Sequence, residues 1–318
     1  MRMASVHTKA LFISALLLIF GASQASAAER LKPFELAYTA NGDMAQVVTQ
    51  VKQKLTANGF DIVGSYAPYT DAKFSNGEVV SAEVIGVTND ALKKAAAETK
   101  FGGYAIVQRV TVTKVTNNGT TQVQVAYTNP TYMANAYRLK SDLADVSAQL
   151  GKALGAQKAY GSQNGLTASD LRDYHYKFLM PYFTDPDTLA KYGSYQEAVN
   201  AVNAGLAAHK GGVSKVYEVA VPGKDETLFG VALSGPSDNA CSGDQYIMAK
   251  IDFHNTKSTG HLPYGILVAG DHVYALGAKF RIAINFPDLS MMGDNSFMSI
   301  MCAPGSIEKA LEDAAKGA

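Results

Sequence analysis

The stretch that decides the fold is "VVSAEVIGVTNDALKKAAAETKFGGYAIVQRVTVTKVTNNGTTQVQVAY", residues 79–127. Runs rich in alternating and β-branched residues predict three strands within it, at 79–88, 104–115 and 120–127. Asn118-Gly119 between the last two runs is a strong short-range signal for a β-hairpin. The residues from Asn89 to Lys100 predict a helix with Asn89 as its N-cap. Strands linked by both a helix and a tight turn indicate an α+β fold with an antiparallel-rich sheet.

The residues before this stretch extend the same pattern toward the N-terminus. "FELAYTA" (34–40) alternates as a strand does, and Asp43 with Gln46 forms a capping-box pair that opens a helix ending at Gly59. "FDIVGSYA" (60–67) then predicts a further strand, which Pro68 stops. The first part of the chain is therefore expected to be one sheet with helices packed against it.

These elements resemble those of a known bacterial family. "VIGVTNDALKKA" before "GYAIVQRVTVT", followed by "TNP" at 128–130, is similar to the bacterial domain of unknown function 302 over about residues 34–137. "YHYKFLMPYF" (174–183) and "MSIMCAPGSIEKAL" (298–311) are similar to segments of longer, periplasmic members of that family. The resemblance implies a small α+β fold, and it implies no activity and no catalytic residue.

The remainder predicts a helical middle and a second α+β unit. Capping pairs at Thr167/Asp170 and Ser194/Glu197 indicate helices within 138–212, and Asp185-Pro186 is expected to start a short one. The last third echoes the first, which suggests a degenerate duplication into two sandwich-like units, although the second helix of the echo is missing at 234–261. The predicted segments are a signal peptide (1–27), an α+β domain (28–137), a helical connector (138–212) and a second α+β domain (213–318).

The N-terminus and the charge indicate the compartment. Residues 1–27 have a basic start, an apolar core and Ala25-Ser26-Ala27, the pattern of a cleaved secretory signal, so a periplasmic or secreted protein is expected. The chain has 28 Lys and Arg against 28 Asp and Glu, and removal of Arg2 and Lys9 with the leader leaves a net charge of −2. This charge argues against nucleic acid as a partner, and no later segment is apolar enough to predict a membrane span.

Cys241 and Cys302 are the only two cysteines. In an oxidising compartment they are expected to form a structural disulfide, with free buried thiols or a metal-bound Cys302 as alternatives. Cys302 ends the methionine-rich run "SMMGDNSFMSIMCAPG" (290–305), where Met298, Met301 and Cys302 could supply three soft ligands to copper. Methionine more often fills gaps in a core, so we expect Met298 and Met301 to be buried and no cofactor to be present.

The segment "DLRDYHYKFLMPYF" (170–183) carries the candidate ligand-binding residues. It is apolar almost all round, which is typical of a helix buried between two units. Aromatic side chains with polar tips can line a cleft between such units and hold a small ligand or a partner protein. The candidates are Tyr174, His175, Tyr176 and Tyr182, and their alternative role is simple core packing.

The linear motifs of common enzymes are missing from the sequence. It has no glycine-rich phosphate loop, no His-Glu-x-x-His and no Gly-x-Ser-x-Gly. The leading hypothesis is therefore a non-catalytic periplasmic protein that binds a small ligand or a periplasmic partner protein. A copper-binding or redox-associated protein is the alternative, and an enzyme whose groups converge only in space is the third.

Overall fold

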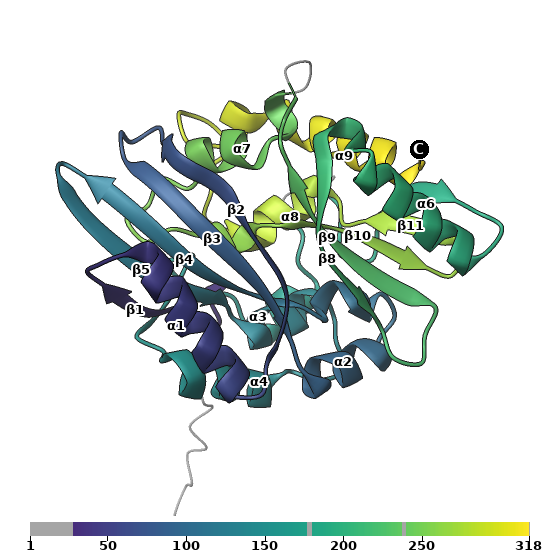
Figure 1. Cartoon of the computed structure of the whole chain (residues 1–318), viewed down its shortest axis with the longest axis horizontal. Coiled ribbons are helices and arrows are strands. Elements are labelled where there is room, and N and C mark those ends of the chain that lie inside the picture. Colours follow the sequence, from purple (N-terminus) through teal and green to yellow (C-terminus); the bar gives the residue numbers. More distant parts are fainter. Residues whose placement is uncertain (1–27, 177–179, 237–239, 318) are drawn as a thin grey trace, which may run out of the picture.

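The computed structural model describes residues 28–176, 180–236 and 240–317. The predicted signal peptide therefore lies outside the described residues. The chain is an α+β protein with two antiparallel sheets, one of six strands and one of five, which confirms the predicted fold class (Figure 1). No helix within these described ranges is both long and apolar enough to cross a membrane.

The first unit, residues 34–154, contains five of the six strands of the larger sheet. Its elements are β1 (Phe34–Ala40), α1 (Met44–Ala57), β2 (Asp61–Lys73), β3 (Val79–Thr88), α2 (Asp90–Ala97), β4 (Gln108–Asn117), β5 (Thr120–Thr128), α3 (Pro130–Ala136) and α4 (Ala144–Leu154). Asn89 caps α2 by accepting a hydrogen bond from the backbone N–H of Leu92 (2.9 Å), and Asn118-Gly119 forms the turn between β4 and β5. These two local signals are placed as the sequence predicts.

The second unit, residues 187–315, repeats this order of elements. They are β7 (Asp187–Lys191), α6 (Tyr195–Ala207), β8 (Val213–Ala220), β9 (Glu226–Leu233), α7 (Asp244–Ile251), β10 (Tyr264–Ala269), β11 (His272–Ala275), α8 (Ala278–Asn285) and α9 (Ala303–Ala315). The strand order is β2-β3-β4-β5-β1 in the first unit and β8-β9-β10-β11-β7 in the second. The two units are thus topological copies, as expected of a duplication, and β6 (Lys158–Tyr160) extends the first sheet beside β1.

Three sequence-based expectations about the second half are wrong. The segment 138–212 is not purely helical, because it contributes β6 to one sheet and β7 to the other. Asp185-Pro186 precedes strand β7 and not a helix, since the Asp187–Lys191 backbone finds its hydrogen-bond partner in β11. The second helix of the repeat is present as α7, within the region where the sequence echo fails.

The helix predicted from "DLRDYHYKFLM" is also shorter than expected. It is the five-residue α5 (Ala168–Arg172), opened by a complete capping box between Thr167 and Asp170. The residues that follow leave the helix at Asp173, and part of the predicted helix, 177–179, lies outside the described residues.

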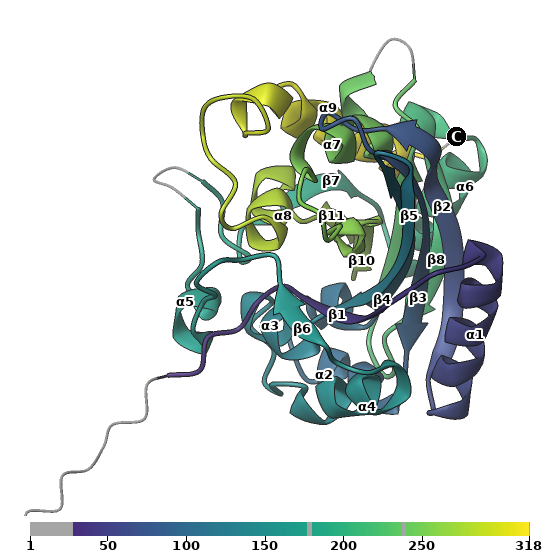
Figure 2. The ribbon, with the colours of Figure 1, turned by 90° about the vertical axis from the view of Figure 1, so that its left-hand side faces the viewer.

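The two units share both hydrophobic cores. In the core beneath α1 and α4, first-unit residues pack with Leu228 and Leu267 of the second unit. In the core beneath α6 and α9, second-unit residues pack with Val80 and Val84 of β3. Figure 2 shows α1 and α8 on opposite faces of the larger sheet. The units therefore cannot be separated into independent domains without exposing apolar surface from each.

The seam between the units is closest where β2 meets β8. A Cβ atom at Gly64 would lie 2.3 Å from the backbone oxygen of Val216, so only glycine fits here. The Tyr217 ring covers two further glycines: a Cβ at Gly86 would lie 2.9 Å from its Cδ1, and one at Gly230 would lie 2.1 Å from its Cζ. One buried ring thus fills the space that glycines leave in both sheets.

Candidate functional site

A cavity of about 680 Å³ opens where the chain enters β7 and where α8 and α9 begin. We call it the His175 pocket, after one of the side chains that line it. Its polar and aromatic wall consists of His175, Tyr182, Asp185, Asp187, Lys279 and Glu308. Prolines, glycines, Ala278 and Met180 form the rest of the lining. The sequence analysis identified two of these residues, His175 and Tyr182, as candidate ligand contacts.

Three elements of the second unit place the charged groups of the His175 pocket. Asp187 is the first residue of β7 and lies opposite Ala275 of β11. Lys279 lies in the first turn of α8, and Glu308 lies on α9 one turn beyond Pro304. No side chain among the described residues caps the start of either helix. Free backbone N–H groups at the two helix starts add partial positive charge near the cavity.

The polar groups of the His175 pocket are largely unused. The side chains of Asp187, Lys279 and Glu308 form no hydrogen bond or ion pair with any described residue. Burial raises the pKa of Asp187 to about 6, the nearby charge of Glu308 raises it further, and Lys279 opposes the shift. A half-buried carboxyl without a partner retains its full capacity to bind a ligand cation.

Aromatic rings complete the His175 pocket. The rings of His175 and Tyr182 lie 4.6 Å apart between centroids, in a tilted arrangement. Each ring offers its face to an aliphatic or cationic group, while carboxylates bind an amine and Lys279 attracts an anion. The pocket therefore combines both signs of charge with an apolar wall.

The other two predicted ligand contacts, Tyr174 and Tyr176, lie outside this pocket. The Tyr174 hydroxyl donates to the backbone oxygen of Ala283 (3.1 Å), and its ring packs against both cores. The Tyr176 hydroxyl donates to the oxygen of Leu289, and its ring lies 4.8 Å from that of Phe297. Both side chains hold their segment against the second unit. This is the packing role that the sequence analysis gave as the alternative to ligand binding.

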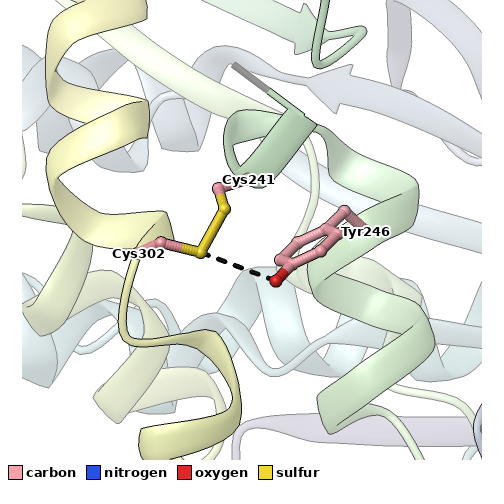
Figure 3. The surroundings of a disulfide bond; sticks show 3 residues. All are labelled: Cys241, Tyr246 and Cys302. Atoms are coloured by element: carbon pink, nitrogen blue, oxygen red, sulfur yellow. Dashed lines mark hydrogen bonds between the residues drawn. A yellow bond between two sulfur atoms is a disulfide. The ribbon is translucent and has the colours of Figure 1, made fainter. Parts of the chain in front are cut away.

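The structure joins Cys241 and Cys302 in a disulfide, with Cα atoms 5.9 Å apart. Figure 3 shows this bond between the segment before α7 and the start of α9, with the Tyr246 hydroxyl 3.5 Å from the Cys302 sulfur. A bonded Cys302 has no thiolate to offer a metal, so the three-ligand copper set of Met298, Met301 and Cys302 does not form.

The expected burial of Met298 and Met301 is wrong. Their exposed fractions are 50% and 69%, because the short 3₁₀ helix Met298–Ile300 turns Ile300 and Phe297 inward and leaves the two methionines outside. Met291 and Met292 on the same loop are exposed as well. In the described parts of the chain, no group of three or more His, Cys, Asp or Glu side chains could hold a metal ion.

A second cavity, of about 860 Å³, lies between β6 and residues 251–258 and 286–289. Some of its polar groups are engaged within the protein. Asp288 accepts a hydrogen bond from Ser162 (3.2 Å), and the Tyr160 hydroxyl donates to the backbone oxygen of Lys257 (2.8 Å). The His175 pocket is the better candidate because more of its charged groups lack partners.

Sequence reasoning missed Asp185, Asp187, Lys279 and Glu308. These residues are spread over more than a hundred positions, and no linear motif connects them. They converge because β7 pairs with β11 and because α8 packs against α9. The two uncapped helix starts were the only local signal, and a glycine or proline at a helix start is too common to identify a site.

Comparison with known proteins finds a family match over the first unit. Residues 36–156 match the family model described as "Domain of unknown function DUF302". No curated protein and no solved structure matches the chain. The family match ends close to the end of α4, although the second unit repeats the topology of the first. The match over residues 36–156 supports the family resemblance predicted from the motifs of the first unit.

Proposed function

We propose that this chain is a non-catalytic periplasmic or secreted protein that binds a small zwitterionic molecule in the His175 pocket. The observation that carries the proposal is the set of unpartnered charges of both signs, Asp187, Glu308 and Lys279, in one cavity. The leader-like residues 1–27 and the disulfide support the compartment, since structural disulfides persist outside the cytoplasm.

The charges of the His175 pocket define the ligand class. Asp185, Asp187 and Glu308 favour an amino group, while Lys279 and the starts of α8 and α9 favour a carboxylate. The rings of His175 and Tyr182 suit the intervening aliphatic or aromatic part. Free amino acids and short peptides have this chemistry. The same hypothesis includes a second possibility, in which this surface binds a partner protein instead of a small molecule.

The test is calorimetric titration of the purified protein with amino acids, dipeptides, diamines and dicarboxylates. We expect a zwitterion to bind, and Asp187→Asn to weaken its binding by roughly 10-fold or more, because losing a charged hydrogen-bond partner costs about 1.5–3 kcal/mol. The matched control is Asp90→Asn, which changes a fully exposed aspartate at the start of α2 and should leave the affinity unchanged.

The pH dependence of binding follows from the same carboxylate. Asp187 must be ionised to hold an amine, and its pKa is about 6, so affinity should fall as the pH drops from 7 to 5. An affinity for the zwitterion that changes neither with Asp187→Asn nor with pH would contradict the proposal. If no small molecule binds, while a partner protein co-purifies with the wild type, the protein-binding form is favoured.

A second candidate function rests on the exposure of the methionines. Met291, Met292, Met298 and Met301 leave four thioethers on one surface loop, and the Met298 N–H donates to the Met291 oxygen (3.1 Å). Thioethers are soft ligands that suit copper(I) in an oxidising compartment. We expect one copper(I) per chain if this function exists, measured by competition with a chromogenic chelator. Binding should be lost in Met298→Leu/Met301→Leu and retained in Met248→Leu, where the methionine is fully buried.

A further inference from the structure

Three ionisable side chains that do not line the His175 pocket meet inside the protein. Lys257, Glu78 and Asp252 are 1%, 2% and 1% exposed. Glu78 immediately precedes β3 in the first unit, whereas Asp252 ends α7 and Lys257 follows it in the second unit. The cluster therefore spans the seam, and its lysine is among the most completely buried large side chains of the described residues.

The contacts of the Lys257 amino group hold it against the Glu78 carboxyl group. Lys257 Nζ touches Glu78 Oε2 and donates a hydrogen bond to the backbone oxygen of Asp252 (3.0 Å). Asn76 Nδ2 donates to the same Glu78 oxygen (2.8 Å), which holds the carboxyl in place. The Phe74 ring lies 5.3 Å from Nζ and closes the apolar side of the cluster.

Asp252 belongs to the same electrostatic cluster. Both of its carboxyl oxygens accept from the Ser258 N–H, at 3.0 and 2.9 Å. Burial raises the pKa of Asp252 to about 7, Lys257 and the Ser258 N–H oppose the shift, and Glu78 adds to it. A carboxyl whose pKa lies near 7 can both give and take a proton within the cluster.

Two full charges are expensive to keep in such surroundings, and a neutral amide in their place removes that cost. Fixed contact without competing water raises the effective concentration of the reactants by orders of magnitude over that in solution. An exposed Lys–Glu pair has neither advantage.

We propose that Lys257 and Glu78 form an intramolecular amide bond that joins the two units. Lys257 Nζ attacks Glu78 Cδ, the Nζ–Cδ bond forms, and the bond from Cδ to the carboxyl hydroxyl breaks. The amine gives up one proton to the leaving hydroxyl, which departs as one molecule of water, and no oxidant or cofactor is required. The product is a covalent link between residues on opposite sides of the seam.

Mass spectrometry of the reduced, denatured full chain tests the proposal. The wild-type mass should be lower than the mass calculated from its processed sequence by one water molecule. Trypsin should release residues 74–93 and 251–279 as one branched peptide, because the modified Lys257 resists cleavage. The exposed pair Lys309/Asp313, in contact within α9, is an internal control and should yield only unlinked peptides.

Two variants keep the test decisive. Lys257→Met and Lys257→Arg should both show the full calculated mass, and arginine retains the positive charge if methionine prevents folding. A wild-type chain with full mass and separate peptides would overturn the proposal and leave a buried ion pair. Loss of water located in any other peptide would overturn it equally.

Discussion

Replacing Tyr217 by alanine is expected to destabilise the protein by about 3–5 kcal/mol, the usual cost of removing a large buried aromatic side chain. The Tyr217 ring lies between Gly86 of β3 and Gly230 of β9, so its loss opens a void that borders both sheets. Because the sheets share their cores, that void weakens the contact between the two units. Urea denaturation of wild type and variant measures the difference.

A double-mutant cycle with Gly230 distinguishes the specific contact between Tyr217 and Gly230 from a general loss of packing. Gly230→Ala alone should cost about 1–3 kcal/mol, because its Cβ would overlap the Tyr217 ring. The same change in the Tyr217→Ala background should cost much less, since the clash is gone, which gives a clear coupling energy. Gly305→Ala is the control, because a Cβ there meets no atom within 4 Å. Additive losses at Tyr217 and Gly230 would contradict this account.

The stability of the protein should also depend on pH through Asp244, the first residue of α7. Its Oδ2 accepts hydrogen bonds from the Tyr66 hydroxyl (3.0 Å) and the Leu233 N–H (3.2 Å), while Oδ1 is buried without a partner. Burial raises the pKa of Asp244 from 3.8 to about 7. The folded state therefore holds a proton on this group that the unfolded state releases at a lower pH.

The direction of the change in stability with pH follows from the raised pKa of Asp244. The stabilisation due to the Asp244 proton is complete below pH 3.8, the value for the unfolded chain, and is lost as the pH rises through about 7. Relative to Asp244→Asn, the wild type should lose roughly 2–3 kcal/mol between pH 5 and pH 8. Asparagine keeps an oxygen that can accept from Leu233 and Tyr66.

Comparison with the variant isolates Asp244 from other groups. Burial lowers the pKa of His261, which contributes the opposite slope below about pH 6.5, and this contribution is present in both proteins. Free energies of unfolding at pH 5, 6, 7 and 8 provide the measurement, with the exposed Asp90→Asn as control. A difference between wild type and Asp244→Asn that stays constant with pH would show that Asp244 does not titrate in this range.

The sequence by itself determined the elements whose signals are local. Asn89 caps its own helix three residues on, and Asn118-Gly119 forms its own turn, so neither depends on a distant partner. The pairing of the only two cysteines also followed from their number and the expected compartment. The α+β class and the DUF302 resemblance likewise rest on short sequence motifs and on the order of the predicted strands and helices.

Only the tertiary structure decided the rest, because strand pairing and burial depend on partners far along the chain. Asp187 begins a strand because β11 supplies its neighbour, and Met298 and Met301 are exposed because Ile300 and Phe297 take the core positions beside them. The His175 pocket combines residues that no spacing rule connects. Glu78 and Lys257 meet only because two topological copies pack against each other, which no local pattern could reveal.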